Sequence, residues 1–343
     1  MATVANALLS VVERVPDGLL DADARTLHRV LPRPTLIHLP GRRPEPLFVS
    51  ALLHGNEDVG LLAVQRLLKS YGARGLPRAL SVFIGNVAAA RENVRRLDGQ
   101  PDFNRIWPGS ETPRTPEHAI MEAVVDEMRA RRVFASIDLH NNTGLNPHYA
   151  CVTRLWHPDL QLAALFGRTV VYFRRPLGVQ TMAFAELCPS VTCECGKTGD
   201  ESGVAHAEDY LEACLQLTEA PMHSVRPGDV HLFHTVATVQ VPRATSFAFD
   251  ATPADIDFGN DLEWFNFREL PAGTVFARCN GRDARCLEVW NEAGEEVSDE
   301  FLEHDGELVR LRRPVMPSML TRDARIIRQD CLCYFMERCP LPD

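Results

Sequence analysis

The sequence lacks an excess of basic residues, which argues against nucleic acid as a main partner. Lysine and arginine number 36 against 46 aspartates and glutamates, and the formal net charge is −10. Binding to a phosphate backbone needs a basic face. A small anion responds instead to the local field of its pocket. We therefore expect a small-molecule anionic substrate and no nucleic acid.

The sequence also lacks any apolar run near the roughly 20 residues that span a bilayer. Residues 1–18 have apolar positions at helical spacing, interrupted by Glu13 and Arg14, and no basic start precedes a continuous apolar run. This pattern predicts neither a signal peptide nor a membrane anchor. We expect a cytoplasmic protein, and the sequence leaves the oligomeric state open, a homo-oligomer included.

The cysteines lack the paired spacing of a structural zinc site. Ten of them are scattered through the chain, and two pairs, Cys193-x-Cys195 and Cys331-x-Cys333, are separated by one residue. Such pairs are candidate metal ligands, but a structural site usually needs two closely spaced pairs that converge. Without a secretion signal, we expect reduced thiols in or near the core.

The pattern of predicted secondary structure changes near Pro221. The first 30 residues are predicted to be helical, and strand and helix patterns then alternate up to residue 220. Beyond Pro221, short alternating segments are separated by Gly, Pro and Asp turns, a pattern typical of β structure. The predicted fold is α/β, with a mixed, largely parallel sheet flanked by helices. We expect a catalytic domain over residues 1–221 and a β-rich C-terminal domain over residues 222–343.

Potential metal ligands follow two predicted strands. His54 and Glu57 come after the apolar strand FVSALL, and His140 ends the strand ASIDLH. Ligands collect beyond the carboxyl ends of strands in open α/β sheets. Imidazole and carboxylate both suit zinc, and three protein ligands leave one position for water. Asp138 lies on the same strand face as His140 and could orient it. The alternative is that each histidine is a hydrogen-bonded structural residue.

A third carboxylate and an arginine-rich loop complete the set of candidates. Glu194 lies in the apolar strand SVTCEC, where burial would raise its pKa towards the range of a general base; the alternative is a salt-bridged structural residue. The loop over residues 91–105 carries Arg95, Arg96 and Arg105 together with Asn104. Guanidinium groups bind carboxylates and stabilise oxyanions, although a solvated charged loop would have the same composition.

In combination, these pieces resemble the succinylglutamate desuccinylase/aspartoacylase family of the zinc carboxypeptidase superfamily. The resemblance covers roughly residues 45–220 and, more weakly, WFNFRELPAGTVFA in the C-terminal part. It rests on strings that occur in the family's order, namely LLHGNE (52–57), GNVAAARENVRR (85–96), DFNRIW (102–107), IDLHNNTG (137–144) and CECGK (193–197).

The resemblance implies a role for each matching residue. His54, Glu57 and His140 would hold one Zn²⁺ per chain. Glu194 would be the general base and acid, and Arg95 would stabilise the oxyanion, with adjacent Arg96 as the alternative.

The same resemblance implies the substrate-binding residues. Asn104 and Arg105 match the pair that binds a substrate carboxylate, and Arg96 and Asn141 are further candidates for contact with the substrate.

The resemblance also implies the reaction, which is zinc-dependent hydrolysis of the amide bond of an N-acyl amino acid resembling N-succinylglutamate or N-acetylaspartate. A peptide-cleaving metallocarboxypeptidase and a non-catalytic zinc- or ligand-binding module are the alternatives.

One departure from the family pattern concerns the substrate: TMAFAELCPS, before Glu194, lacks the arginine that aspartoacylases carry there. Arg154 and Arg175 are candidates for the missing charge.

Overall fold

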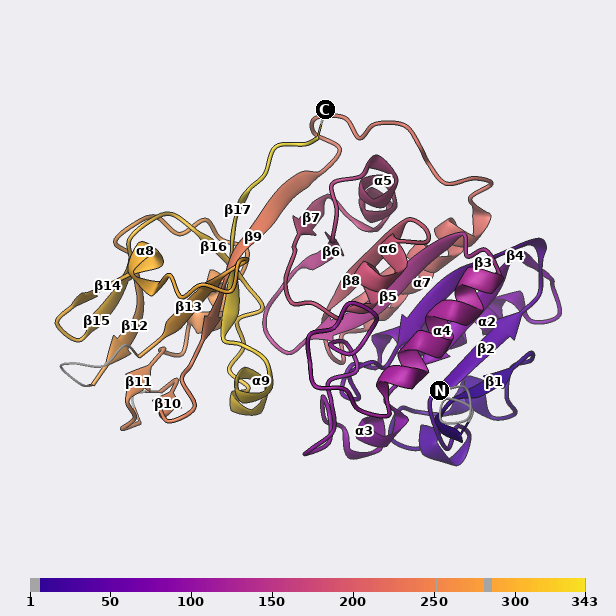
Figure 1. Cartoon of the computed structure of the whole chain (residues 1–343), viewed down its shortest axis with the longest axis horizontal. Helices are drawn as coiled ribbons and strands as arrows, with labels where there is room; N and C mark the ends of the chain where they lie inside the picture. Colours follow the sequence, from indigo (N-terminus) through magenta and orange to yellow (C-terminus); the bar gives the residue numbers. More distant parts are fainter. Residues whose placement is uncertain (1–6, 251, 281–285, 343) are drawn as a thin grey trace. The chain divides into compact units, whose positions relative to one another are not determined.

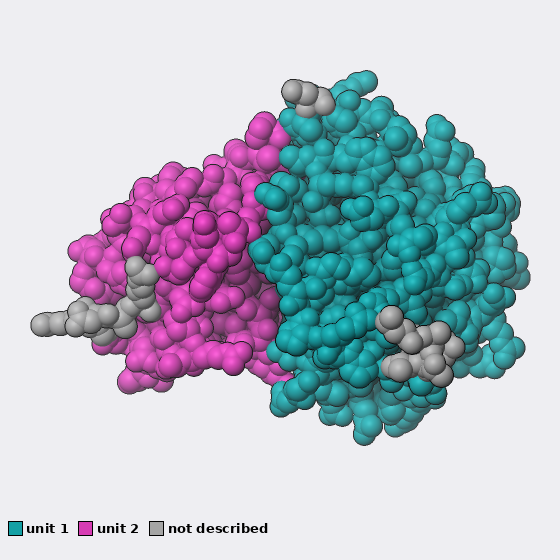
Figure 2. All heavy atoms as spheres, viewed as in Figure 1, with its two compact units in different colours: residues 1–141, 148–231, 341–343 teal, residues 142–147, 232–340 magenta. Residues whose placement is uncertain are grey.

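The computed structural model describes residues 7–250, 252–280 and 286–342, which form two compact units. Unit 1 contains the chain up to Asn141 and residues 148–231, and unit 2 contains residues 142–147 and 232–340 (Figure 2). The main change from unit 1 to unit 2 along the chain thus falls after His231, whereas the sequence pattern predicts a domain boundary at 221/222. Residues 1–6, part of the N-terminal segment in which no signal peptide is predicted, lie outside the described part.

Unit 1 is built on a mixed sheet in which parallel pairings predominate. Its strands follow the order β1-β2-β4-β3-β5-β8-β6-β7. The pairs β2–β4 and β6–β8 are antiparallel, whereas β3 lies parallel to both β4 and β5. This confirms the predicted fold class. The strands are β1 Ser10–Val12, β2 Thr35–Leu39, β3 Gly41–Ala51, β4 Leu76–Ile84, β5 Ala135–Asn142, β6 His148–Val152, β7 Thr169–Tyr172 and β8 Ser190–Lys197.

Helices flank this sheet (Figure 1). Helix α2 packs on β3 and α7, and α7 also contacts β4 and β8. The prediction that the first 30 residues are helical is wrong for most of the described part, because Ser10–Val12 pairs with β2 as strand β1 and only short 3₁₀ turns follow it. The helices are α2 Val59–Tyr71, α3 Val87–Glu92, α4 His118–Ala130, α5 His157–Phe166, α6 Gln180–Ala185 and α7 Glu201–Gln216.

An aromatic cluster anchors the loop that precedes α4. Trp107 is fully buried and makes edge contacts with Phe83 and Phe184 at ring-centroid distances of 5.8 and 5.9 Å. Phe184 also stacks on Phe48 of β3 at 4.4 Å. Because aromatic side chains bury a large apolar area, this cluster holds the chain just after Asn104 and Arg105 against the sheet.

Unit 2 is rich in β structure, as the sequence predicted for the C-terminal part. Strand β9 pairs with β13 and β17, and β17 pairs with β16; a separate sheet has the order β10-β11-β12-β15-β14. The elements are β9 His231–Gln240, β10 Phe247–Ala248, β11 Ile256–Asp257, β12 Val275–Cys279, β13 Glu288–Asn291, α8 Ser298–Phe301, β14 Leu302–Asp305, β15 Leu308–Leu311, β16 Met316–Ser318, α9 Ala324–Gln329 and β17 Cys333–Arg338.

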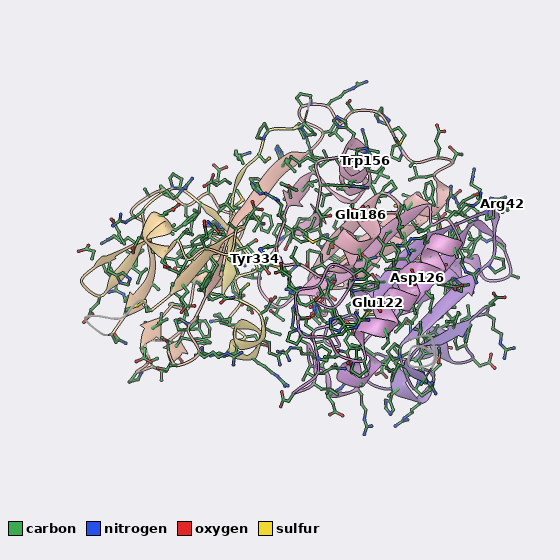
Figure 3. All side chains as sticks on the ribbon, viewed as in Figure 1. Arg42, Glu122, Asp126, Trp156, Glu186 and Tyr334 are labelled. Atoms are coloured by element: carbon green, nitrogen blue, oxygen red, sulfur yellow. A yellow bond between two sulfur atoms is a disulfide. The ribbon has the colours of Figure 1, made fainter. Side chains whose placement is uncertain are left out.

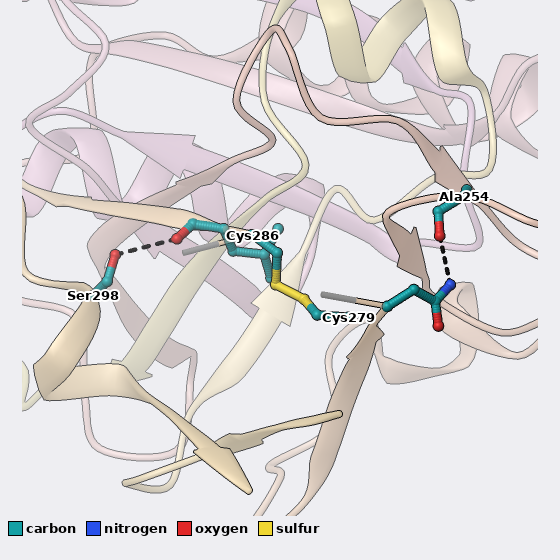
Figure 4. The surroundings of a disulfide bond; sticks show 6 residues. Ala254, Cys279, Cys286 and Ser298 are labelled. Carbon is teal, nitrogen blue, oxygen red and sulfur yellow. Dashed lines mark hydrogen bonds between the residues drawn. A yellow bond between two sulfur atoms is a disulfide. The ribbon is translucent and has the colours of Figure 1, made fainter. Parts of the chain in front are cut away.

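The prediction of reduced thiols holds for the closely spaced pairs but not for every cysteine. Cys193 and Cys195 are buried free thiols, as are Cys331 and Cys333. Cys279 and Cys286, in contrast, form a disulfide (Figure 4). Sequence spacing could not reveal this bond, because only the fold brings the two residues together. Among the described helices, none is long and apolar enough to cross a membrane.

Candidate metal and catalytic site

The turn after β3 delivers His54 and Glu57 to the edge of the unit 1 sheet. Leu52, just beyond the strand, has a φ of 54°, which bends the chain sharply out of the sheet. Gly55 then lies so close to helix α3 that a Cβ atom would be 2.2 Å from the carbonyl carbon of Ala89, so only glycine fits. The turn ends where α2 begins, and it therefore presents both side chains at one strand tip.

The side chains of His54, Glu57 and His140 converge. Glu57 Oε1 lies 2.9 Å from His54 Nδ1, and Glu57 Oε2 lies 2.7 Å from His140 Nδ1. One ligand atom from each of the three residues lies within 4.8 Å of the other two. All three residues are at most 6% exposed. The structure thus brings the three predicted metal ligands together.

An aspartate binds the far nitrogen of each imidazole. His54 Nε2 donates to Asp102 Oδ1 at 3.0 Å, and His140 Nε2 donates to Asp138 Oδ2 at 2.8 Å. Strand pairing sets Ser50 opposite Asp138, and the Ser50 hydroxyl donates to the other carboxylate oxygen at 2.6 Å. Hydrogen bonds of this kind fix the tautomer and the ring orientation of metal-binding histidines. Both Nδ1 atoms are left facing Glu57.

The Asn104–Arg105 pair lies beside His140. The side-chain amide of Asn104 donates to Asp138 Oδ2 at 3.1 Å, and its carbonyl oxygen accepts from the backbone N–H of Gln180 at 2.8 Å. The guanidinium of Arg105 donates from Nη1 to the Asn104 backbone oxygen at 2.8 Å. The start of α6 therefore holds Asn104 in place, and Asn104 in turn anchors Arg105.

The structure distinguishes between the two adjacent arginines. Arg95 is 5% exposed, and its guanidinium contacts Asp102 Oδ2 from Nε at 3.0 Å and from Nη2 at 2.9 Å. Arg96 is turned along the loop, where Nη1 donates to the backbone oxygen of Gln100 at 2.9 Å. Arg95 therefore belongs to the cluster around His54, whereas the contact of Arg96 stabilises the loop.

Glu194 is buried in β8, opposite Tyr149 of β6, and is 7% exposed. Burial, reinforced by the charges of Glu57 and Asp138, raises the pKa of Glu194 to about 7. The positive charges that His140 and His54 can carry act in the opposite direction. Glu194 is consequently poised between its two protonation states near neutral pH, as a group that accepts and returns a proton must be.

Asn141, near the end of β5, makes hydrogen bonds to the start of α2 and to the end of β8. Its side-chain oxygen accepts from the backbone N–H of Val59, at the start of α2, at 3.0 Å. Its backbone N–H donates to Glu57 Oε2 at 3.4 Å, and its amide donates to the backbone oxygen of Gly196 at 3.5 Å. These bonds position Glu57, so the local structure already gives Asn141 a role other than contact with a substrate.

The donor chemistry of this cluster fits a divalent cation. Four carboxylates gather here, and two of them, Glu57 and Asp102, have pKa values well below the usual range: burial opposes ionisation, but the neighbouring positive charges outweigh it. Buried carboxylates are costly unless cations compensate them. Arg95 compensates Asp102. A zinc ion on the Nδ1 atoms of His54 and His140 and on Glu57 would supply the positive charge opposite Glu57 in place of the protons on the two Nδ1 atoms, and nitrogen and oxygen ligands suit that ion.

Two contributors could not be inferred from sequence reasoning. Asp102 lies within the string DFNRIW, but nothing in the sequence pattern pairs it with His54, 48 positions away. Gln180 acts through its backbone N–H, which leaves no signal in residue type. Of the candidates for a second substrate charge, Arg154 binds Asp159 and stacks over Trp156, and Arg175 contacts Glu111 at 3.1 Å.

Comparison with known families and proteins relates the chain to one enzyme family. The family model described as "Succinylglutamate desuccinylase/Aspartoacylase catalytic domain" matches residues 45–217. A curated succinylglutamate desuccinylase from Burkholderia orbicola (strain MC0-3) is 30% identical over 183 residues. That alignment covers 44% of this chain and 49% of the relative, so the match spans about half the length of the curated protein.

Solved structures share the fold. The succinylglutamate desuccinylase from Chromobacterium violaceum superposes with a TM-score of 0.59 at 18% identity, covering 88% of this chain and 87% of that one. Murine aminoacylase 3 gives a TM-score of 0.53 at 14% identity, covering 87% of this chain and 96% of that one. At these identities the likeness establishes the fold alone.

The Asp102–His54 bond leads to a test of metal binding. We predict that Asp102→Asn lowers zinc affinity by about 10-fold or more, because His54 loses the charged partner that orients its ring. Competition with a fluorescent chelator measures this affinity. Asp98→Asn, an exposed change in the same loop, is the matched control and should bind zinc like the wild type. Equal affinities for all three proteins would contradict the assignment of Asp102 as a positioning residue.

Proposed function

Because the chain belongs to the succinylglutamate desuccinylase/aspartoacylase family, we propose that it hydrolyses the amide bond of an N-acyl amino acid in a zinc-dependent reaction. The products are a carboxylic acid and a free amine. The observation that carries this proposal is the convergence of His54, Glu57 and His140 in one buried cluster. The buried Glu194, whose pKa is raised to about 7, supports it.

The metal would be held by His54 Nδ1, His140 Nδ1 and the Glu57 carboxylate. When bound there, zinc supplies a Lewis acid that activates water and polarises a carbonyl group. Asp102 and Asp138 keep the two imidazoles turned towards Glu57, because each aspartate accepts a hydrogen bond from the N–H of the far nitrogen. This arrangement fixes the ligands in advance and lowers the cost of reorganising them.

Glu194 is the proposed general base and then the general acid. Its carboxylate takes the proton of the attacking water and passes it to the nitrogen of the leaving amine, so that no net proton is consumed in the exchange. A pKa near 7 suits both transfers, because the charged form that accepts a proton and the neutral form that donates one are both populated near neutral pH.

Arg95 and Arg105 are the proposed anion-binding groups. The Arg95 guanidinium would stabilise the negative charge that develops on the carbonyl oxygen, with Asp102 setting its orientation. Arg105 would bind the carboxylate of the substrate, and Asn104 would assist it. Arginine is suited to this task because its planar group can donate two parallel hydrogen bonds to a carboxylate.

The substrate class that we propose is an N-acyl amino acid resembling N-succinylglutamate or N-acetylaspartate. The family description and the name of the Burkholderia orbicola relative support this class. These two sources do not identify the acyl group. Arg154 and Arg175, the candidates for binding a second charge of the substrate, both have carboxylate partners within the protein.

A substrate panel tests the proposal directly. The protein is supplied with N-succinyl, N-acetyl and other N-acyl derivatives of acidic and neutral amino acids, with zinc present or chelated, and the released amine is measured. We expect hydrolysis of at least one carboxylate-bearing acyl amino acid, loss of turnover on chelation and recovery on adding zinc. Hydrolysis of peptides alone would indicate a metallocarboxypeptidase, and no turnover of any compound would contradict the proposal.

Glu194→Gln separates catalysis from metal binding. The amide keeps the shape of the side chain but cannot accept the proton, so kcat should fall by about 100-fold or more. Zinc content should stay unchanged, because Glu194 is not one of the proposed ligands. Glu186→Gln, an exposed change shortly before β8, is the control and should retain full turnover (Glu186 is labelled in Figure 3). Undiminished hydrolysis by Glu194→Gln would show that another group is the base.

A further inference from the structure

A second group of metal-binding side chains lies in unit 2, and the proposed reaction uses none of them. It consists of Cys279, Cys286 and His304, and we call it the cysteine–histidine cluster. The two sulfur atoms and one ring nitrogen of His304 all lie within 4.8 Å of one another. Cys279 ends strand β12, and His304 comes from β14, on the other side of β15. Three separate points of the chain thus converge.

The three side chains of the cluster differ in their exposure to solvent. Cys279 and Cys286 are 3% and 2% exposed, whereas His304 is exposed. The two sulfur atoms are therefore shielded, whereas the imidazole of His304 borders on solvent, from which an ion can approach.

The backbone beside both cysteines is anchored independently of the disulfide. The N–H of Cys279 donates to the backbone oxygen of Glu307 at 2.7 Å, and that of Asn280 donates to Asp255 at 2.9 Å. On the other side, the hydroxyl of Ser298 donates to the backbone oxygen of Leu287 at 3.4 Å (Figure 4). These bonds hold the two thiols near each other even when the disulfide is open.

A purely stabilising disulfide accounts poorly for this arrangement. The bond joins residues only seven positions apart, and short loops gain least from being closed. It also gives no reason for an imidazole to lie beside the two sulfur atoms. Two cysteines and a histidine are, by contrast, soft and borderline ligands that favour zinc.

We propose that the cysteine–histidine cluster is a redox-gated site for a thiophilic divalent cation such as Zn²⁺. The dithiol form binds the ion through both sulfur atoms and His304, with water as a fourth ligand. The disulfide form does not bind it, because the thiolate is the ligand that metals require. The proposal is independent of the reaction proposed for unit 1.

The disulfide form and the metal-binding dithiol form interconvert by thiol–disulfide exchange and metal binding. A small dithiol opens the Cys279–Cys286 bond by thiol–disulfide exchange: the protein gains two electrons and two protons, and the dithiol becomes a disulfide. Metal binding then displaces the two thiol protons into solvent. In reverse, a small disulfide accepts two electrons from the metal-bound thiolates and two protons from solvent to become a dithiol, the protein disulfide forms again and the ion is released.

Cobalt(II) tests this proposal on the full chain. A thiolate bound to cobalt gives a charge-transfer band in the near ultraviolet, whereas the histidines and carboxylate of the unit 1 site contain no sulfur. Protein reduced with a phosphine and desalted without oxygen should develop this band to saturation at one ion per cluster. The disulfide form should show less than a tenth of that intensity.

Variants assign the band to its ligands. Cys286→Ser should remove most of the intensity, and His304→Ala, an exposed change compatible with folding, should weaken cobalt binding about 10-fold or more. Cys339→Ser alters a partly exposed thiol outside the cluster and should leave the band unchanged. The proposal is overturned if reduced wild-type protein shows no band, if the band survives Cys286→Ser and His304→Ala at full strength, or if the disulfide form gives an equal band.

Discussion

The Glu57 carboxylate, which bridges the imidazoles of His54 and His140, is the interaction on which the proposed site depends. It joins two strand tips that are far apart in the sequence, and it faces the same nitrogen atom, Nδ1, of each ring. The orientation is maintained from behind, because Asp102 and Asp138 take up the other ring nitrogens. Where such a constellation is buried, the geometry of the ligands is set by the protein and not by the incoming ion.

The surrounding fold supplies the conditions for this concentration of charge. Parallel strands β3 and β5 end at the same edge, and their register sets Ser50 beside Asp138. The buried indole of Trp107 holds the loop that carries Asn104 and Arg105. Burial of the site raises the pKa of Glu194 to about 7, whereas ionic partners keep the Glu57 carboxylate charged. Burial and ion pairing thus act together on the charges of this cluster.

Sequence reasoning could predict the fold class and the convergence of His54, Glu57 and His140, because strand-end positions follow from hydrophobic pattern and topology. It could not predict contacts that depend on tertiary geometry. The choice between Arg95 and Arg96 needed the side-chain directions, and the disulfide between Cys279 and Cys286 needed a fold in which the two residues meet. The N-terminal strand was missed because helical spacing of apolar residues is overridden by pairing with β2.

The central claim is that His54, Glu57 and His140 share one metal ion. Anomalous diffraction at the zinc absorption edge, on crystals grown with zinc, tests it most directly. The account predicts a peak within bonding distance of His54 Nδ1, His140 Nδ1 and a carboxylate oxygen of Glu57. A fully loaded crystal with no peak at this position, and with the two imidazoles still hydrogen-bonded to Glu57, would contradict it.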